Sequence, residues 1–290
     1  MINFANFTDL KKEISSILGK PYFQTDNCIL FNGNSTDLLK KLSSPFLNSI
    51  ITSPPYNIGK EYEKVKPIDE YINWSSAWLA SSENLLLPNG SLLLNIGYVK
   101  IENKARAIPL PYLLWDKINM FLNQEIIWNY SAGVACKNYL SPRNEKILWY
   151  VKDEKNYTFN LDPIRDKNVK YPNSKRNGKL RVNTLGKNPS DVWEIAKVTT
   201  GTNRSSSERT SHPTQFPTDL VDRLVLGFTN ERDIILDPFM GSGTTFISSI
   251  KYNRFCIGFE ISKNYCEIAK NRILKFEKEI NNSQLTLEIG

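Results

Sequence analysis

Residues 53–56, Ser-Pro-Pro-Tyr, follow the apolar run that starts at Ser49, and their types suggest chemistry. Adjacent prolines fix φ and remove two backbone N–H donors, so the chain must leave the sheet here with free carbonyl groups. The Ser53 hydroxyl and the Pro54 carbonyl can then accept hydrogen bonds from an amino group. The Tyr56 ring offers a face for stacking, worth roughly 1–3 kcal/mol with a nucleic-acid base. A rigid strand exit with a buried tyrosine is the alternative interpretation of this tetrapeptide alone.

A second such stretch, DPFMGSGTT, begins at Asp237 directly after an apolar run. An acid at a strand end followed by a Gly-rich turn lets a ligand approach the backbone closely. A P-loop needs Lys where Thr244 stands, and a dinucleotide fingerprint needs a small residue where Phe246 stands, so neither template fits. Glu260 lies nineteen residues beyond Gly241, at the end of a second apolar run. A carboxylate at this position can accept hydrogen bonds from both hydroxyls of a ribose. The pattern predicts a nucleoside site without a phosphate requirement.

The elements that must position these residues follow from alternating apolar runs and helix-compatible segments, which predict βαβ units and a mainly parallel sheet. Residues 155–210, rich in Asn, Ser, Lys and Arg, do not fit this alternation and are interpreted as an insertion. The expected strands are 28–33, 49–53, 91–97, 125–130, 146–152, 233–237 and 255–261. The expected helices are 35–42, 71–87, 111–122, 218–228, 244–252 and 265–280.

The charge of the chain is unevenly placed. The 290 residues, 40% of them hydrophobic, suit one domain with an insertion, and the net charge is +7. Residues 164–210 contain eleven Lys or Arg and four Asp or Glu. Their net charge, eleven minus four, equals the net charge of the whole chain. An isolated charge run is usually a solvated loop. Interleaving with aromatic, amide and glycine residues instead favours contacts to nucleic-acid phosphates and bases.

Other classes of protein are disfavoured by the composition. The four cysteines are scattered without a CxxC pair, and His212 is the only histidine, so we expect no metal site and reduced cysteines. The N-terminus lacks the order of a secretory signal, and no apolar run reaches the roughly 18 residues that span a bilayer. We therefore expect no membrane association and a cytoplasmic location.

Together, TSPPY and DPFMGSGTT resemble the S-adenosylmethionine-dependent amino-methyltransferases of DNA found in restriction-modification systems. Their order, with a basic insertion between them, resembles the circularly permuted β group. The resemblance covers about residues 28–275 and includes RNEKILWYVK, GKNPSDVWEI and HPTQFP. It implies a seven-stranded, mostly parallel Rossmann-like sheet in which the last strand of the first half is antiparallel. The implied division is an N-terminal extension (1–27), a catalytic half (28–154), a target-recognition insertion (155–210) and a cofactor-binding half (211–290).

The resemblance also implies roles for individual residues. S-adenosylmethionine is the implied cofactor and double-stranded DNA the implied partner, with a cognate restriction endonuclease as a possible second partner. Family members commonly carry an acid where this chain has Asn34, whose amide oxygen can accept the same hydrogen bond from the cofactor's adenine. The expected catalytic residues are Ser53, Pro54, Pro55 and Tyr56. The expected cofactor-binding residues are Asn34, His212, Thr214, Asp237, Pro238, Phe239, Gly241, Ser242, Gly243, Thr244 and Glu260. The expected DNA-binding residues are Lys175, Arg176, Lys179, Arg181 and Arg204.

The implied reaction is methylation of an exocyclic amino group on a base. Such a group cannot reach a methyl donor beside a sheet edge while it is stacked in a duplex, so the base must flip out. Direct in-line displacement needs no covalent enzyme intermediate. Methylation of cytosine carbon 5 uses a cysteine that follows a proline. No cysteine of this chain follows a proline, so we do not expect methylation of carbon 5. The residues before the four cysteines are Asn27, Ala135, Phe255 and Tyr265.

The choice of base depends on Ser53. In the family, Ser at the first position of this tetrapeptide usually accompanies cytosine N4, whereas Asp or Asn usually accompanies adenine N6. N4-cytosine methylation is therefore the leading hypothesis and N6-adenine methylation on the same fold the alternative. A DNA-binding protein without catalysis, and a methyltransferase acting on RNA or protein, remain further alternatives.

Overall fold

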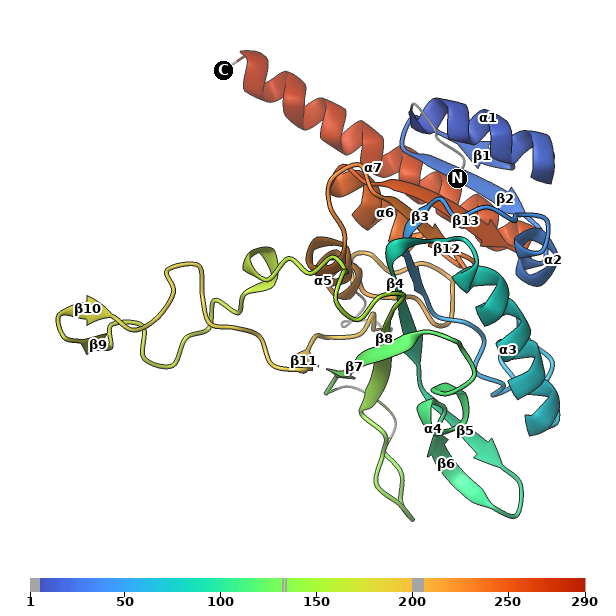
Figure 1. Cartoon of the computed structure of the whole chain (residues 1–290), viewed down its shortest axis with the longest axis horizontal. Helices are drawn as coiled ribbons and strands as arrows, with labels where there is room; N and C mark the ends of the chain where they lie inside the picture. Colours follow the sequence, from blue (N-terminus) through green and yellow to red (C-terminus); the bar gives the residue numbers. More distant parts are fainter. Residues whose placement is uncertain (1–5, 132, 134, 200–205, 290) are drawn as a thin grey trace.

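The structure is a computed structural model that describes residues 6–131, 133, 135–199 and 206–289. A twisted sheet crosses its centre, helices cover both faces, and an arm projects far to one side (Figure 1). The mostly parallel α/β sheet expected from the sequence is confirmed, with nine strands in place of seven. The strand order is β1-β2-β13-β12-β3-β4-β8-β7-β11.

Two short edge strands account for the difference from seven. β1 (Phe23–Gln24) pairs antiparallel with β2, and β11 (Val192–Glu194) pairs parallel with β7. Segments this short carry too little alternation of apolar and polar residues to be predicted as strands. The other seven strands are β2 (Cys28–Asn32), β3 (Leu47–Thr52), β4 (Leu86–Ile96), β7 (Phe121–Asn129), β8 (Asn144–Val151), β12 (Ile234–Asp237) and β13 (Phe255–Glu260).

Strand direction changes at β8. Neighbours from β2 to β4 pair in parallel, whereas β8 pairs antiparallel with both β4 and β7. This agrees with the antiparallel last strand of the first half that the family resemblance implies. The carboxyl ends of β2, β13, β12, β3 and β4 therefore meet at one edge of the sheet.

Helices bury apolar side chains on both faces of the sheet. One hydrophobic cluster joins α1 (Phe7–Leu18), α2 (Ser35–Leu39), α3 (Ile68–Glu83) and α4 (Pro111–Leu114) to the sheet, with Trp78 of α3 fully buried. The other cluster joins α5 (Thr218–Phe228), α6 (Thr244–Lys251) and α7 (Lys263–Ile289). Strands covered on both sides must be apolar throughout, which is why they read as continuous apolar runs.

One predicted helix is shorter than expected, and two elements were not predicted. The helix expected at 111–122 ends at Leu114, because residues from Phe121 onward pair with β8 as β7. Tertiary pairing overrides local propensity there. An antiparallel hairpin of β5 (Tyr98–Ile101) and β6 (Ala105–Pro109) and the N-terminal helix α1 were not predicted.

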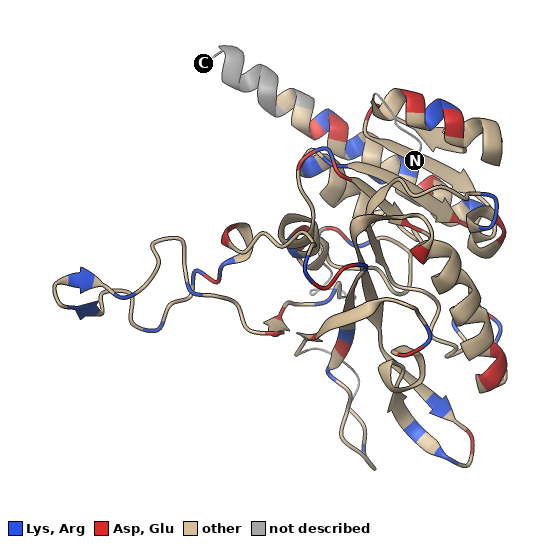
Figure 2. Ribbon diagram, in the orientation of Figure 1, with Lys and Arg blue, Asp and Glu red and all other residues tan. Residues whose placement is uncertain are grey.

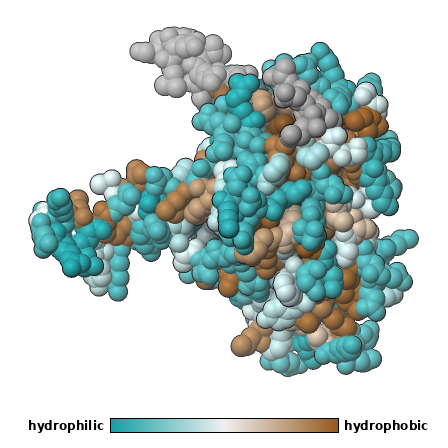
Figure 3. Space-filling model, viewed as in Figure 1, coloured by the Kyte–Doolittle hydropathy of each residue, from teal (hydrophilic) through white to brown (hydrophobic). Residues whose placement is uncertain are grey.

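Most of residues 155–210 form the arm. It includes a 3₁₀ turn at Asp162–Ile164, and near its tip β9 (Lys175–Arg176) and β10 (Lys179–Leu180) form a hairpin. Asn177 (φ 51°) and Gly178 (φ 77°) make the two-residue turn, a pair that tolerates the positive φ that such hairpins require. Basic residues mark the tip (Figure 2). The space-filling view shows a hydrophilic tip with apolar side chains along the stem (Figure 3).

Candidate active site

A cavity of about 1360 Å³ opens where the carboxyl ends of the parallel strands meet. Ligands bind at this edge in open α/β sheets, because the loops that leave the strands converge there. Residues from both halves of the chain, far apart in sequence, line it together. The expected residues that line the cavity are Asn34, Ser53, Pro54, Pro55, Tyr56, His212, Thr214, Asp237, Phe239, Gly241, Ser242, Thr244 and Glu260.

Pro238 and Gly243 do not line the cavity, although a cofactor-binding role was expected for both. The Pro238 carbonyl accepts a hydrogen bond from the buried Ser35 hydroxyl. Gly243 precedes α6 with φ of 82°, and a Cβ there would lie 2.9 Å from the Cβ of Ala269. These two residues therefore shape the Gly-rich turn from behind, through contacts with α2 and α7.

Asp237 at the end of β12 holds the two halves of the site together. Its Oδ1 accepts a hydrogen bond from the Thr52 hydroxyl at 2.7 Å and from the Phe239 N–H at 3.1 Å. Its Oδ2 accepts from the Thr245 hydroxyl at 2.7 Å. Burial raises the pKa of Asp237 to about 6, because desolvation outweighs these three hydrogen bonds. The strand that precedes Ser-Pro-Pro-Tyr is thus fixed to the Gly-rich turn.

Glu260 at the end of β13 supports the Gly-rich turn. Its Oε2 accepts from the Gly241 N–H and its Oε1 from the Ser262 N–H, each at 2.8 Å. Burial raises the pKa of Glu260. Gly241 has φ of 53°, and a Cβ there would lie 2.9 Å from the Nε2 of His212, so only glycine fits. A carboxylate has about four acceptor sites, which leaves acceptors on Glu260 for a ligand in the cavity.

An aromatic wall closes another side of the cavity. The Tyr62 and His212 rings stack with centroids 5.9 Å apart, and His212 lies 4.4 Å from the Tyr265 ring. The Tyr62 hydroxyl lies 3.1 Å from the Thr214 hydroxyl, and the Tyr265 hydroxyl donates to Glu61 at 2.5 Å. Burial lowers the pKa of His212 to about 4, so its imidazole is neutral near pH 7.

The Ser-Pro-Pro-Tyr corner begins directly after β3. The Pro55 carbonyl accepts from the Tyr71 hydroxyl at 2.8 Å, which anchors the corner to α3. The Ser53 and Tyr56 hydroxyls lie 2.7 Å apart, and the Tyr56 hydroxyl also donates to Glu145 at 2.8 Å. Burial raises the pKa values of Tyr56 and Glu145. The Ser53 hydroxyl and the Pro54 carbonyl thus belong to a fixed corner on the cavity wall.

Asn34 lies at the rim of the cavity and is exposed. Its side-chain oxygen caps α2 by accepting from the Thr36 N–H at 2.9 Å. An Asn at this position satisfies an otherwise unpaired helix N–H without adding a charge to the rim.

The basic residues assigned to DNA lie apart from the cavity. Lys175, Arg176, Lys179 and Arg181 are exposed around the hairpin at the tip of the arm. Arg204 lies outside the described residues. The Ser-Pro-Pro-Tyr corner and the Gly-rich turn therefore meet in one cavity. The hairpin of β9 and β10 lies at the far end of the arm, away from the central sheet (Figure 1).

Several cavity residues were missed by the sequence reasoning. Glu145 is the third residue of the RNEKILWYVK stretch, and an acid at the start of an apolar strand was a signal that could have identified it. Tyr62 lies in a mostly polar loop, where no sequence pattern distinguished it. Other cavity residues that the sequence did not single out are Trp74, Trp128, Tyr130, Lys197, Arg209, Thr245 and Tyr265.

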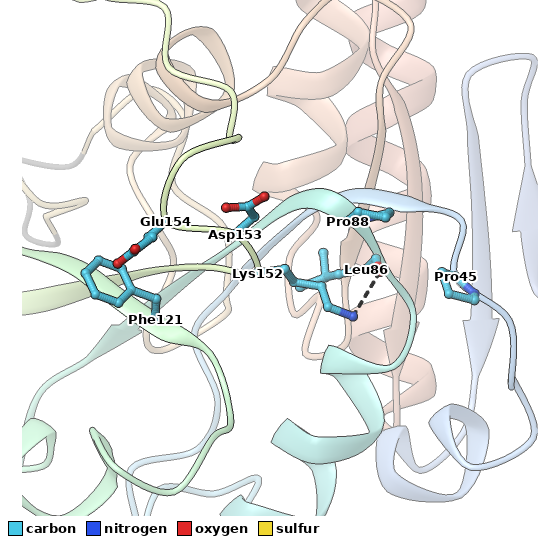
Figure 4. A pocket seen from close by; sticks show the side chains of 7 residues that line it. All are labelled: Pro45, Leu86, Pro88, Phe121, Lys152, Asp153 and Glu154. Carbon is cyan, nitrogen blue, oxygen red and sulfur yellow. Dashed lines mark hydrogen bonds between the residues drawn. The ribbon is translucent and has the colours of Figure 1, made fainter.

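A second hollow of about 570 Å³ lies at the opposite edge of the sheet, near Pro45, Leu86 and Phe121 (Figure 4). Lys152 donates there to the Leu86 carbonyl at 3.4 Å, and the side chains do not converge on a common point. Within the described ranges, no three His, Cys, Asp or Glu side chains are grouped to hold a metal ion. The same ranges contain no helix both long and apolar enough to cross a membrane.

Comparison with known proteins identifies the class. The family model for DNA methylase matches residues 47–271. The type II methyltransferase M.ScaI of Streptomyces caespitosus is 50% identical over 261 residues, covering 90% of this chain and 86% of that protein. The chain therefore belongs to the DNA methylase family, and it is an enzyme, a DNA methyltransferase.

Solved structures agree on the fold. The PvuII DNA methyltransferase (cytosine-N4-specific) superposes with a TM-score of 0.69 at 18% identity, covering 91% of this chain and 96% of that one. A putative DNA modification methylase from Thermus thermophilus, complexed with S-adenosyl-L-methionine, gives a TM-score of 0.59 at 21% identity. It covers 86% of this chain and 95% of that one.

Proposed function

We propose that this DNA methyltransferase transfers a methyl group from S-adenosylmethionine to the N4 amino group of a cytosine flipped out of duplex DNA. We further propose that it recognises a specific sequence and protects host DNA beside a cognate restriction endonuclease. The observation that carries the proposal is the position of Ser53 and Pro54 in the same cavity as Glu260 and the Gly-rich turn. Acceptors for an amino group and a nucleoside-binding turn thereby face one space.

The residues of this cavity fit the cofactor. The cavity volume accommodates a nucleoside with an amino-acid tail beside a flipped base. Glu260 has free acceptors for ribose hydroxyls, and Gly241 brings bare backbone to the cavity wall. The aromatic rings of Tyr62, His212 and Tyr265 give one side of the cavity an apolar surface. S-adenosylmethionine, when bound, supplies a methyl group on a positively charged sulfur.

The chain's own residues prepare the base. The lone pair of an exocyclic amino group is delocalised into the ring, so the group is a poor nucleophile until acceptors hold its hydrogens. Ser53 and Pro54 supply those acceptors, and the Tyr56 ring lies on the cavity wall for stacking. In the transfer the nitrogen would bond to the methyl carbon as the carbon–sulfur bond breaks with its electrons on sulfur, and the amino group would release one proton to solvent water.

The choice of cytosine rests on Ser53. In the family that the sequence resembles, Ser at the first position of this tetrapeptide usually accompanies cytosine N4, whereas Asp or Asn usually accompanies adenine N6. In this proposal the basic tip of the arm binds the DNA backbone at a distance from the flipped base. Such backbone contacts orient the protein on the duplex, which suits target recognition.

The test is to identify the methylated nucleoside. Unmethylated DNA is treated with the enzyme and S-adenosylmethionine, digested, and analysed by mass spectrometry, and we expect N4-methylcytosine. Ser53→Ala should lower kcat about 10²-fold, the loss typical when one polar contact to the reacting group is removed, with cofactor affinity unchanged. Ser16→Ala, at an exposed serine of α1, is the matched control. N6-methyladenine in place of N4-methylcytosine would overturn the base assignment.

A further inference from the structure

The Tyr56 hydroxyl lies at the centre of a hydrogen-bonded cluster beneath the Ser-Pro-Pro-Tyr corner. Its oxygen lies 2.7 Å from the Ser53 Oγ, 2.7 Å from the Asn95 Nδ2 and 2.8 Å from the Glu145 Oε2. Asn95 Nδ2 also donates to Glu145 Oε2 at 2.6 Å. Gly97 packs against the ring from behind, since a Cβ there would lie 3.0 Å from the Tyr56 Cε2. The ring and its hydroxyl are therefore fixed in place.

The chemistry of the partners determines the direction of each hydrogen bond. An amide nitrogen only donates, and an ionised carboxylate only accepts. The phenol has one hydrogen, which goes to the Glu145 carboxylate at 2.8 Å, because the Asn95 backbone carbonyl is farther away at 3.3 Å and a serine hydroxyl is a weaker acceptor than a carboxylate. Tyr56 can then only accept from Ser53, so the Ser53 hydroxyl hydrogen points at Tyr56. The lone pairs of Ser53 are left as acceptors on the cavity side.

We infer that Glu145 is a positioning residue for methyl transfer, acting through Tyr56 on Ser53. Its carboxylate fixes Ser53 as a hydrogen-bond acceptor toward the target amino group. Its negative charge, at the far end of the chain of hydrogen bonds, stabilises the positive charge that the amino nitrogen gains as the methyl group arrives. This inference rests on the proposed function, and it holds for the amino group of either base.

The surroundings of Glu145 give this charge its effect. Glu145 is only partly exposed, on the cavity wall, where charge interactions are stronger than in water. Lys146 on the same strand is hydrogen-bonded to Tyr98 and Asn144, and Lys197 lies over the Tyr130 ring with its Nζ 5.1 Å from the centroid.

Burial raises the pKa of Glu145, and the hydrogen bonds from Asn95 and Tyr56 and the charges of Lys197 and Lys146 lower it. The other titratable groups that face it are the phenols of Tyr56, Tyr62 and Tyr130. Protonation would remove the charge and turn an obligate acceptor into a possible donor. The active form is therefore the ionised one, and kcat should fall as pH falls through the raised pKa.

Glu145→Gln is the test, because its amide oxygen can still accept from Tyr56 and Asn95 while the charge is lost. We expect kcat to fall roughly 10- to 100-fold, with the dissociation constants for S-adenosylmethionine and DNA within about twofold of the wild type. The acid limb of the kcat–pH profile should disappear in the variant. Glu154→Gln, at an exposed acid on the opposite edge of the sheet, is the matched control. An unchanged kcat and pH profile, or equal losses of cofactor affinity and melting temperature, would overturn the inference.

A binding measurement tests the hydrogen-bond direction without turnover. Removing the exocyclic amino group from the target base of a duplex should weaken wild-type binding several-fold. The same removal should have a smaller effect on Tyr56→Phe, which frees the Ser53 hydrogen, and an equal effect in both proteins would contradict the inference. The methylated nucleoside formed by the wild type tests the proposed function separately, because its identity does not depend on Glu145.

Discussion

At the scale of single residues, the acids of the cavity are held by hydrogen bonds from the protein itself. Glu260 accepts from Gly241 and Ser262, and Asp237 accepts from Thr52 and Thr245. A group whose orientation is already fixed loses little further freedom when a ligand binds. These side chains are therefore held in fixed orientations at the cavity to which we assign the cofactor.

Glu260→Gln should weaken S-adenosylmethionine binding about 10- to 100-fold, because one charge-assisted hydrogen bond contributes roughly 1.5–3 kcal/mol. In addition, the new amide NH₂ would face the N–H of Gly241 or of Ser262. Isothermal titration calorimetry measures the change. Glu154→Gln serves again as the control, and unchanged affinity in Glu260→Gln would remove Glu260 from the cofactor site.

His212 should make stability depend on pH. Its folded pKa of about 4 lies below the ordinary value of 6.5, so between these pH values the unfolded chain binds more protons than the folded one. Stability must then fall as pH falls from 6.5 to 4, by about 3 kcal/mol for this group. His212→Gln should lose less stability over that range.

Urea unfolding of both proteins at about pH 7, 5.5 and 4.5 measures this difference through the free energy of unfolding. The acids Asp237 and Glu260 titrate in both proteins, so their contributions cancel in the comparison. Parallel pH dependences would show that His212 is accessible to protons in the folded state.

At the scale of elements, the proposed function places DNA contacts on the arm, apart from the cavity. Replacing Lys175, Arg176 and Lys179 together by Glu should weaken DNA binding at low salt. It should also reduce the slope of log K against log salt by about 3, because each phosphate neutralised by a cation contributes roughly 0.9 to that slope. Fluorescence anisotropy over a salt series measures both quantities, and cofactor affinity should not change.

The matched control is replacement of the exposed lysines Lys12, Lys20 and Lys41 by Glu, which changes the net charge equally on another part of the surface. Equally weakened binding in the two triple variants would mean that DNA responds to total charge. Unchanged binding in the arm variant would place the DNA contacts elsewhere.

At the scale of the whole molecule, the two halves of the chain meet at the cavity. Thr52 bonds to Asp237, Ser35 to Pro238, and Glu61 to Tyr265. A cofactor bound between the halves should stabilise the entire fold, by about 2.7 kcal/mol at a concentration of about 100 Kd.

Differential scanning fluorimetry should therefore show one transition that moves upward with S-adenosylmethionine and stays in place with ATP. A stabilising effect of ATP equal to that of S-adenosylmethionine would contradict a site that is specific for S-adenosylmethionine. No shift with S-adenosylmethionine would contradict a cofactor site between the two halves.

Residue types and their spacing were enough to predict the mostly parallel sheet and to single out Ser-Pro-Pro-Tyr, the Gly-rich turn and Glu260, which the fold brings to one cavity. Each depends on local chemistry: proline removes N–H donors, glycine permits φ of 53° at Gly241, and strands buried on both faces must be apolar. Short-range signals of this kind are readable without knowing which segments meet.

Contacts between distant segments were beyond such prediction. The fold placed Glu145 against Tyr56, 89 residues earlier in the chain, and built the wall of Tyr62, His212 and Tyr265 from three separate segments. It also ended the helix expected at 111–122, because strand pairing with β8 takes over at Phe121. Such contacts depend on which chain segments the fold brings within a few ångströms. Residue type and spacing along one sequence do not contain that information, because the same polar residue can lie in solvent or in a buried network.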